Sequence, residues 1–502
     1  MTPQTKITTA FLELIVQELE TSYIEDDVHL TELTIFLVDL TPFRLRLSAE
    51  TPFLIVSKEN IQKLKRDQIT EIVRQELYIR QERPGSAVIL VEGDAEFLRP
   101  FGEDPFWAFI FDRRQMQSLL DHANPKRGLL ESLREQIPLR FLSPYEPDQP
   151  VAGSQFHGRT TEINLILSYP DRSFSLEGGR RIGKTSLLKE TQQQLKKRLP
   201  KEQHPRLVWY DFWGYSGIEP FIADVMRHFK ETPRPARGTL VEYFPTFIKL
   251  MKKRYGGPII FFLDEIDDLI EYERKSVFNL LLLFRRMATE QNCRCLVAGF
   301  RLLTAECYRH DTPLTFLQRL PLSNLTKAQS RAMLIEPMQN MGVDIQNAVF
   351  PEVLSDSGGH PQILQLYGQS FVELLDKEQT RKLTTKHVSQ VKRTGVIHDR
   401  LVETLIDNTT DLEFAIVCSM ANKDDFDMVA INEKLKEHGI EKSIKELQKI
   451  CRSLEAIGII RKQGQYAQVW QFAIPLQPAL ATLRASIVEL AWEKALADEK
   501  ER

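Results

Sequence analysis

Hydrophobic and polar positions alternate with two different periods between residues 151 and 325. Short apolar runs of strand length are separated by longer segments with helical spacing, and this order predicts a parallel sheet covered by helices. Residues 259–263 (IIFFL) show no polar alternation, so we expect a central strand buried on both faces. The other strands of this region are predicted at residues 173–176, 207–212, 295–298 and 320–321, and a helix is predicted at residues 274–290.

Residues 1 to about 145 form a separate predicted α/β module, followed by a proline-rich linker at residues 138–150. Strands are predicted at residues 33–40, 43–47, 53–56, 87–91 and 107–111, and helices at residues 11–20, 61–80, 115–121 and 129–135. Acidic residues near the strand ends raise the alternative of a metal-dependent nuclease. The Glu-x-Lys that such sites use does not occur in the first 150 residues, so we expect a regulatory or interaction module.

The last third of the chain has helical spacing for most of its length. Residues 326–395 are predicted to be all-helical. Further on, two helices (429–439 and 444–458) precede two short strand-like runs (459–461 and 469–472), which predicts a winged helix. A final helix is predicted at residues 479–500.

A glycine-rich loop follows the predicted strand 173–176. Residues 178–186 (GGRRIGKTS) fit the phosphate-binding pattern G-x-x-x-x-G-K-[ST], and helical sequence follows them. This arrangement points backbone N–H groups and a helix N-terminus at a bound anion. We expect Lys184 to reach the outer phosphates of a nucleotide and the Thr185 hydroxyl to bind Mg²⁺. The loop residues expected to contact the nucleotide are Gly178, Gly179, Arg180, Arg181, Ile182, Gly183, Lys184, Thr185 and Ser186.

Carboxylates follow the predicted buried strand 259–263. Asp264 and Glu265 end it, and ligands of open α/β sheets bind at the carboxyl ends of the strands. We expect Asp264 to hold Mg²⁺, directly or through water. Glu265 is expected to orient and polarise the attacking water of a phosphoryl transfer, with Lys184 as its catalytic partner. Asp267 and Asp268 are expected only to cap the following helix.

Composition sets broad limits on function. A chain of 502 residues with 42% hydrophobic and 27% charged residues is typical of a globular protein of roughly three domains. Its net charge of −3 gives no overall attraction to nucleic acid or anionic membranes. The five cysteines have no metal-site spacing, and the N-terminus has no signal-peptide pattern. No apolar run is long enough to span a bilayer, so we expect a cytoplasmic protein without membrane contact.

Several further motifs occur in a fixed order around the loop. Residues 156–162 (FHGRTTE) are similar to an F-x-G-R-x-x-E segment, residues 299–301 (GFR) follow the fourth strand, and residues 359–361 (GHP) match G-x-P. With the phosphate-binding loop, the acidic strand end and the winged helix, residues 140–475 resemble the STAND class of signalling ATPases, which are relatives of AAA+ proteins. The likeness is strongest to bacterial and archaeal members with a variable N-terminal domain.

The resemblance implies an α/β fold in four parts. These are an N-terminal α/β domain (1–140), a P-loop NTPase domain with a parallel sheet (141–325), a helical lid (326–398) and a winged-helix domain with a C-terminal helix (399–502). It implies that Phe156, Gly158 and Arg159 lie near the adenine together with Pro361, and that Arg301 reads the γ-phosphate. Arg319 stands where AAA+ relatives carry an inter-subunit arginine finger, which STAND proteins often lack.

The function implied is that of a switch that binds and slowly hydrolyses ATP, with ATP, ADP and Mg²⁺ as ligands. Its nucleotide state would control homo-oligomer formation or binding of a protein partner, in signalling or defence. Two alternatives stay open. One is a DNA-directed AAA+ ATPase, such as a transposition regulator or replication loader, whose winged helix carries Lys442, Lys445, Lys449 and Arg452 among glutamates. The other is a nucleotide-locked scaffold that does not hydrolyse ATP.

Overall fold

A computed structural model of the chain divides into two compact units. One contains residues 1–145, 334–349 and 368–388, and the other contains residues 146–333, 350–367 and 389–502. The structure describes residues 7–14, 24–25, 33–38, 51–56, 86–92, 101–103, 106–136, 138–153, 156–232, 238–275, 280–463, 469–474, 476–480, 483 and 485–501.

The first unit contains a mixed six-stranded sheet with the order β1-β2-β3-β4-β6-β5. Neighbouring strands are antiparallel for β1–β2, β2–β3 and β5–β6, and parallel for β3–β4 and β4–β6. Apolar side chains of its strands are buried, including Phe53, Val88 and Phe109. The strands are β1 (Ile24–Glu25), β2 (Leu33–Val38), β3 (Thr51–Val56), β4 (Ser86–Val91), β5 (Phe101–Glu103) and β6 (Phe106–Phe111).

Predicted elements of this unit agree with the structure wherever it describes them. Residues 7–14 are helical, and helices α4 (Arg113–Leu120) and α5 (Pro125–Gln136) follow the sheet. Helix α4 begins with a capping box in which Asp112 and Gln115 each bond the other's backbone N–H. The strand predicted at residues 43–47 and the helix predicted at residues 61–80 lie outside the described residues.

The segment predicted to be a linker is ordered and partly buried. Helix α6 (Leu139–Leu142) lies within it, and Leu139, Leu142 and Tyr145 are buried. The Tyr145 hydroxyl donates to Leu334 O at 2.6 Å, and the Asp376 carboxylate accepts from the backbone of Leu139 at 2.7 Å. The boundary between the two units, after Tyr145, lies within the segment predicted to be a linker, and the apolar residues before this boundary pack in the first unit.

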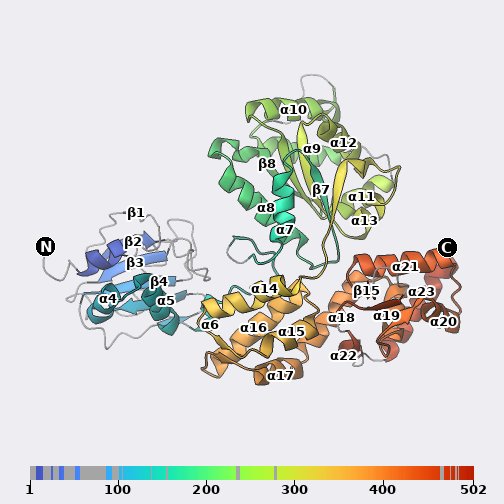
Figure 1. Cartoon of the computed structure of the whole chain (residues 1–502). Helices are drawn as coiled ribbons and strands as arrows, with labels where there is room; N and C mark the ends of the chain where they lie inside the picture. The colour runs from blue at the N-terminus through green and yellow to red at the C-terminus, as the bar shows by residue number, and fades with distance from the viewer. Residues whose placement is uncertain are drawn as a thin grey trace. The chain divides into compact units, whose positions relative to one another are not determined.

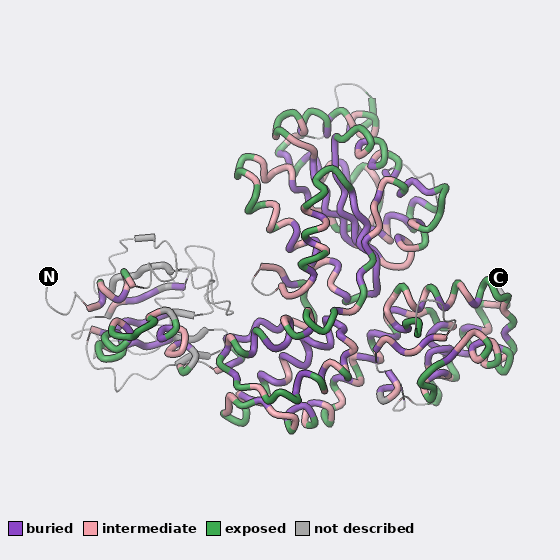
Figure 2. Tube along the Cα trace, in the orientation of Figure 1, coloured by how far each residue is buried: buried purple, intermediate pink, exposed green. Residues whose placement is uncertain are grey.

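The second unit contains the parallel five-stranded sheet that the sequence predicts, with the order β11-β7-β10-β9-β8 (Figure 1). Every strand pair in it is parallel. The central strands β7, β10 and β9 are buried at every position, as Figure 2 shows. The strands are β7 (Ser173–Glu177), β8 (Leu207–Asp211), β9 (Ile259–Asp264), β10 (Cys293–Ala298) and β11 (Leu317–Pro321).

Two hydrophobic layers cover the two faces of this sheet. Alternate residues of β9 enter opposite layers: Phe261 packs with helices α9 to α12, and Phe262 packs with α7 and α8. This explains the unbroken apolar run in the sequence. The helices are α7 (Thr160–Ser168), α8 (Lys184–Arg198), α9 (Ile218–His228), α10 (Leu240–Arg254), α11 (Ile266–Arg274), α12 (Leu280–Thr289) and α13 (Arg301–Cys307). Short 3-10 turns η3 (Lys201–Arg206) and η4 (Pro313–Phe316) precede β8 and β11.

The single helix predicted at residues 274–290 is wrong at its start. Arg274 is the last residue of α11, and α12 begins at Leu280. The buried Glu273 carboxylate accepts from the backbone of Leu280 at 2.6 Å and of Leu281 at 3.2 Å. This side chain satisfies two of the N–H groups that a helix start leaves unpaired.

The helical region after the sheet contains α14 (Lys327–Asn340), α15 (Val349–Ser357), α16 (Pro361–Lys377) and α17 (Thr385–Arg393). It is not all-helical as predicted, because the two-residue strands β12 (Asp344–Ile345) and β13 (Lys382–Leu383) pair in parallel. These strands are too short to leave a periodic pattern in the sequence.

The C-terminal region is a winged helix with additional helices. Helices α19 (Asp411–Ser419), α20 (Met428–Glu437) and α21 (Ile444–Ala456) accompany an antiparallel sheet of β14 (Phe426–Asp427), β16 (Val469–Phe472) and β15 (Ile460–Lys462). Helix α18 (Val396–Asn408) precedes these elements, and α22 (Gln477–Leu480) and α23 (Ala485–Glu501) follow them. The predicted final helix is therefore two helices.

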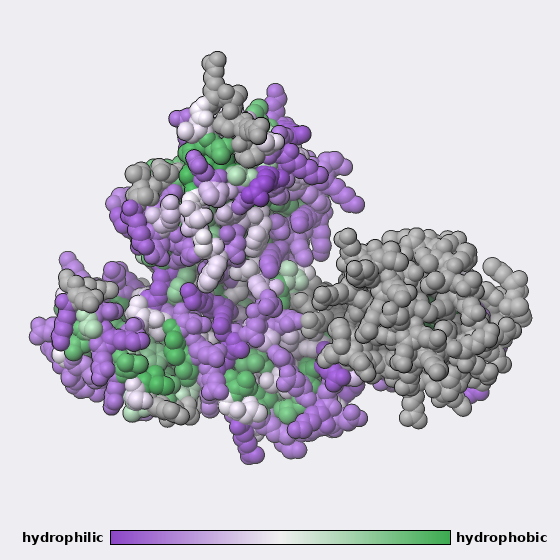
Figure 3. Space-filling model, turned by 180° about the vertical axis from the view of Figure 1, so that it is seen from behind, coloured by the Kyte–Doolittle hydropathy of each residue, from purple (hydrophilic) through white to green (hydrophobic). Residues whose placement is uncertain are grey.

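Polar side chains cover most of the coloured surface in Figure 3, and apolar ones gather in separate small patches there. Among the described residues, no helix combines the length and the hydrophobicity that crossing a bilayer requires.

Candidate functional site

The phosphate-binding loop joins the buried strand β7 to helix α8, as the sequence predicts. The two glycines of the phosphate-binding pattern, Gly178 and Gly183, are required for different reasons. A Cβ on Gly178 would lie 2.8 Å from Leu322 O, so backbone packs directly against this residue. Gly183 has φ +97° and nothing within 4 Å of its Cβ position, so its left-handed conformation rather than crowding favours glycine. Gly183 faces open space at the start of α8.

The Lys184 side chain lies inside the loop. Its Nζ donates to Gly178 O at 3.0 Å and to Gly179 O at 2.7 Å, and the side chain is buried. Burial lowers the pKa of the Lys184 amine to about 8, against the opposing pull of the Glu265, Asp267 and Asp264 carboxylates. The amine is thus a buried cation close to the acidic end of β9.

Asp264 and Glu265 lie at the carboxyl end of β9. The Thr185 hydroxyl at the start of α8 lies beside the Asp264 carboxylate and opposes the effect of burial on its pKa. Burial raises the pKa of Asp264, and the nearby Asp211 charge adds to this. Burial and then the Asp264 charge raise the pKa of Glu265. Glu265 has φ +48°, a conformation unusual for a residue with a side chain and enriched at functional sites.

The Thr185 hydroxyl and the Asp264 carboxylate fit the donor set of a magnesium site. Mg²⁺ binds oxygen ligands, keeps several waters, and takes one or two protein oxygens together with substrate phosphates. No group of three or more His, Cys, Asp or Glu side chains in the described part of the chain has metal-site geometry. The residues therefore suit an ion that is shared with a nucleotide rather than a closed protein cage.

A pocket of about 350 Å³ opens over the loop, within the range of small-molecule sites. The part of the pocket beside Lys184, here called the phosphate end, is lined by loop residues together with Glu265 and Phe300. The other end of the pocket is lined by residues 146–151 and by three residues of α16. The predicted nucleotide-binding residues that line it are Phe156, Arg159, Arg180, Arg181, Ile182, Gly183, Lys184, Thr185, Ser186 and Pro361. Gly158, Gly178, Gly179 and Asp264 do not line it.

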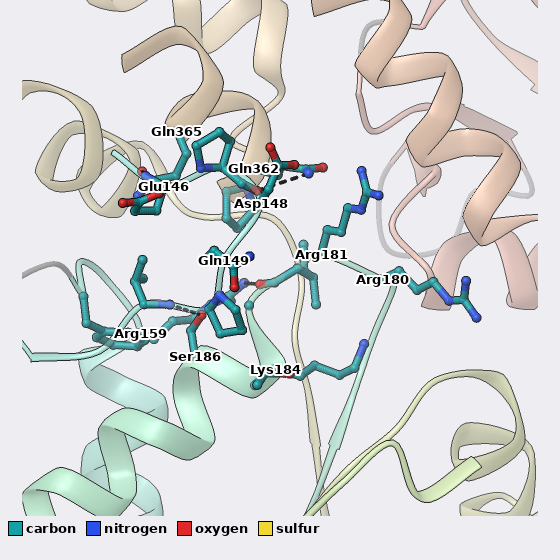
Figure 4. A pocket seen from close by; sticks show the side chains of 18 of the residues that line it. Glu146, Asp148, Gln149, Arg159, Arg180, Arg181, Lys184, Ser186, Gln362 and Gln365 are labelled. Carbon is teal, nitrogen blue, oxygen red and sulfur yellow. Dashed lines mark hydrogen bonds between the residues drawn. The ribbon is translucent and has the colours of Figure 1, made fainter. Parts of the chain in front are cut away.

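Residues 146–151 cross the pocket as an extended strap. At one end the Glu146 N–H donates to Gln365 Oε1 at 3.0 Å, and Gln362 Nε2 donates to Pro147 O at 3.2 Å. At the other end the Val151 N–H donates to Ser186 Oγ at 3.1 Å. Figure 4 shows the two glutamines on one side of the strap and Ser186 on the other. The sequence prediction missed these glutamines, although the spacing of Pro361, Gln362 and Gln365 places them on neighbouring helix faces.

Arg159 is buried and holds the loop from behind. Its guanidinium donates to Ile182 O at 3.2 Å and to Ser323 O at 2.5 Å, and it pairs with Glu162 at 3.1 Å. Burial lowers the pKa of Arg159 despite this pair. The residue also has φ +57° just before α7. Gly158 does not line the pocket, and its Cβ position is 3.3 Å from Gln329 Cβ.

The winged-helix region packs on the outside of the phosphate-binding loop. The Arg180 N–H donates to Asn408 Oδ1 at 2.6 Å, and a Cβ on Gly179 would lie 2.7 Å from Ile457 O. The Arg181 guanidinium lies 3.5 Å from the Asp407 carboxylate, which also lines the pocket. The end of α18 therefore touches the loop at consecutive residues.

Arg301, the predicted reader of the γ-phosphate, does not line the pocket. Its guanidinium donates to the Glu413 carboxylate and to Asn408 O, both of the winged-helix region, and more weakly to Ser453 Oγ at 3.4 Å. Phe300 lines the pocket instead, with its ring centroid 5.8 Å from Lys184 Nζ. An aromatic residue at this position was not predicted from the sequence.

Arg319 makes a bidentate ion pair within its own sheet. Its Nη2 and Nε lie 2.6 and 2.9 Å from the carboxylate of the buried Glu177, and its guanidinium stacks 3.6 Å from the Tyr308 ring centroid. The Glu177 pair raises the pKa of Arg319. His360, beside Pro361, is also buried, and burial lowers the pKa of its imidazole to about 4, so it is neutral.

Comparisons with known proteins find similarity in structure alone. Neither a protein-family profile nor a curated sequence matches the chain. Among solved structures, the Walker-type ATPase PABY2304 of Pyrococcus abyssi is 16% identical, with 67% of this chain and 99% of that chain covered at a TM-score of 0.46. The ORC2 protein of Aeropyrum pernix, in ADPNP–ADP complexes, is 11% identical, with 70% and 98% covered at a TM-score of 0.49. The Thermotoga maritima RuvB Holliday junction branch migration motor is 15% identical, with 63% and 94% covered at a TM-score of 0.35. Such distant likenesses say nothing about substrate or partner, and the function has to be inferred from the geometry of the site.

Proposed function

We propose that this protein is a switch that binds and hydrolyses ATP and couples its nucleotide state to self-association or to binding of a protein partner. The observation that carries the proposal is that the buried Lys184 amine, the Thr185 hydroxyl and the carboxylates of Asp264 and Glu265 meet at one edge of the sheet. This is the set of groups that phosphoryl transfer from a magnesium-bound triphosphate requires.

Each residue has a distinct role in this proposal. Lys184 and the loop N–H groups bind the β- and γ-phosphates, whose negative charge the buried amine neutralises. Thr185 and Asp264 would hold Mg²⁺, which supplies further neutralisation of phosphate charge. Glu265 accepts a hydrogen bond from the attacking water and orients it, and its raised pKa makes its carboxylate a better proton acceptor than an ordinary glutamate.

The switch part of the proposal draws on what surrounds the pocket. The phosphate-binding loop, Pro361 of α16 and Asp407 of α18 all line it. A nucleotide that contacts the loop, α16 and α18 at once favours the arrangement in which all three line the pocket. ADP and ATP differ in the charge that they place near the Arg181–Asp407 ion pair. Exchange of one nucleotide for the other would then alter the packing of the winged-helix region on the loop.

The test is to measure phosphate release and molecular size of the full chain with ADP and with a non-hydrolysable ATP analogue. We expect slow, magnesium-dependent release and a larger species with the analogue than with ADP. The Lys184→Ala variant should show neither. Phosphate release without any nucleotide-dependent change in size, and without any partner retained selectively in one state, would leave an ATPase that is not a switch. Tight ATP binding without release would favour the non-hydrolysing scaffold.

The basic side chains of the winged helix are not equally available to DNA, the ligand in the DNA-directed alternative. Lys442 is nearly buried and pairs with the Glu499 carboxylate at 2.5 Å, so it is not available to a DNA phosphate. Lys445, Lys449 and Arg452 are exposed, and Lys462 lies 4.0 Å from Glu455, so these side chains leave the DNA-directed alternative open. Adding duplex DNA to the same assays provides the check, because DNA-stimulated hydrolysis that weakens as salt rises would favour this alternative over a signalling switch.

A further inference from the structure

The Asp267 carboxylate binds the turn between β10 and α13. Its Oδ2 accepts from the Phe300 N–H at 2.5 Å, and its Oδ1 accepts from the N–H groups of Leu302 at 2.6 Å and Leu303 at 3.4 Å. Helix α13 has no side-chain cap of its own, since its N-cap residue is Phe300. Asp267, on the first turn of α11, therefore supplies the cap from a neighbouring helix. The sequence prediction had assigned Asp267 only to its own helix.

The turn between β10 and α13 packs closely against Asp267. A Cβ on Gly299 would lie 2.4 Å from Asp267 Oδ2 and 2.7 Å from the Ile266 Cγ2 methyl. Only glycine allows the backbone to approach this closely, and both carboxylate oxygens are then used by N–H groups. The position of the turn is thus determined by the first turn of α11.

This turn carries the Phe300 ring into the phosphate end of the pocket, which Glu265 also lines. The ring centroid is 5.8 Å from Lys184 Nζ and 5.7 Å from Arg180 Cζ, within the range of cation–π attraction. Helix α11 begins directly after Glu265. The first turn of α11 therefore follows Glu265, the residue proposed to orient the attacking water. The same turn contains Asp267, which fixes the Phe300 ring that limits the space for water.

We propose that Asp267 is a positioning residue for hydrolysis, which acts by holding the Phe300 ring at the phosphate end of the pocket. There the ring excludes bulk water and leaves space for the water that Glu265 orients. This inference rests on the proposed ATPase function. It adds Asp267, which contacts neither the nucleotide nor the attacking water. Asp267 affects turnover through the position of Phe300.

Asp268 offers a matched control at the next position. Its Oδ2 accepts one N–H, from Gly214 at 2.9 Å, and an asparagine oxygen can accept that bond equally well. At Asp267 both oxygens accept, so asparagine would turn its NH₂ group toward a backbone N–H. The Asp267→Asn and Asp268→Asn substitutions each remove one charge, but the first breaks more hydrogen bonds and also removes a charge that acts on Lys184.

The experiment compares kcat and KM for ATP in these two variants of the full chain. We expect Asp267→Asn to lower kcat at least about tenfold with KM within about threefold, because misplacing a group near the reacting atoms mainly affects the transition state. Asp268→Asn should stay within about twofold of wild type in both. Equal losses in the two variants would indicate an effect of charge and overturn the proposal, as would equal retention of activity.

A second pair of variants tests the role of Phe300 and covers the case in which Asp267→Asn folds poorly. Phe300→Ala should lower kcat as Asp267→Asn does, Phe300→Leu should retain most of it, and the Asp267→Asn/Phe300→Ala double variant should be no worse than Phe300→Ala alone. Full activity of Phe300→Ala, or additive losses, would overturn the route through Phe300. Wild-type turnover and its loss in Glu265→Gln are measured in the same assay. Their absence would refute the ATPase function and this inference with it, whereas their presence leaves the variants to decide the inference alone.

Discussion

The Thr185 hydroxyl lies beside the Asp264 carboxylate and lowers its pKa against the effect of burial, although the two residues follow different strands of the sheet. Both β7, which leads into the loop before Thr185, and β9, which ends at Asp264, run parallel to β10 and flank it. Their carboxyl ends therefore meet at one edge. The proposed site requires that the loop with Lys184 lies beside the acidic end of β9. The order of the strands in the sheet meets this requirement.

Replacing Lys184 by alanine should abolish measurable binding of ATP and ADP. The amine is buried within the loop, and without it the phosphates would meet a pocket that lacks its innermost cation. Titration calorimetry measures the loss. Lys197→Ala, on the exposed part of the same helix, is the control and should bind as wild type does. Retained binding in the Lys184 variant would move the nucleotide site elsewhere.

Replacing Glu265 by glutamine should leave nucleotide affinity within about twofold and lower hydrolysis at least about 100-fold, the usual contribution of a positioned general base. Glutamine has the same shape but cannot accept the proton of the attacking water. Phosphate release in single turnover, together with equilibrium binding, separates the two effects. Hydrolysis at the wild-type rate in this variant would remove Glu265 from the catalytic role.

Nucleotide affinity should fall at alkaline pH because burial lowers the pKa of Lys184 to about 8 in the free protein. Phosphate binding favours the protonated amine, so affinity should be constant well below pH 8 and should decrease by about tenfold per pH unit well above it. The phosphates of the nucleotide are fully ionised in this range and do not contribute. Binding of ADP measured between pH 7 and 9.5 provides the check. A flat profile to pH 9.5 would contradict the assignment to Lys184.

Replacing Arg319 by alanine should destabilise the protein by about 3 kcal/mol, the usual cost of leaving a buried charge without its partner. Glu177 is buried, and the Arg319 guanidinium binds both of its oxygens. Denaturant unfolding measures the change, and Arg286→Ala, which breaks only the exposed ion pair with Glu290, should cost much less. If Arg319 served instead as an arginine finger, the variant would keep its stability and lose hydrolysis that depends on self-association.

The fold of the sheet region could be predicted in detail because its signals are local. An unbroken apolar run predicts a strand buried on both faces, and the run at residues 259–263 lies within β9. The predicted strands at residues 207–212, 295–298 and 320–321 overlap β8, β10 and β11. Errors arose where packing overrides local composition. Residues 274–290, for example, do not form one helix, because Arg274 is the last residue of α11.

Some residues of the site could likewise be located from the sequence, and others could not. The loop, Asp264 and Glu265 could be located from the sequence because fixed spacing and strand ends identify them. The contacts of the Arg301 side chain could not be predicted, because its partners Glu413 and Asn408 are more than 100 residues away in the sequence. The functional roles assigned to all of these residues stay predictions, and so do the four domain boundaries, the STAND assignment and the DNA alternative.

The sequence alone determined the chemistry at the centre of this protein: a loop able to bind phosphates, a buried strand that ends in carboxylates, and a winged helix further along. These features follow from residue type and short-range spacing, which the backbone converts directly into local structure. Only the tertiary structure decided that Phe300 rather than Arg301 lines the phosphate end, that Asp267 caps a helix other than its own, and that α18 packs on the loop. Such relationships depend on contacts between distant segments, and these contacts arise only when the hydrophobic layers bring the segments together.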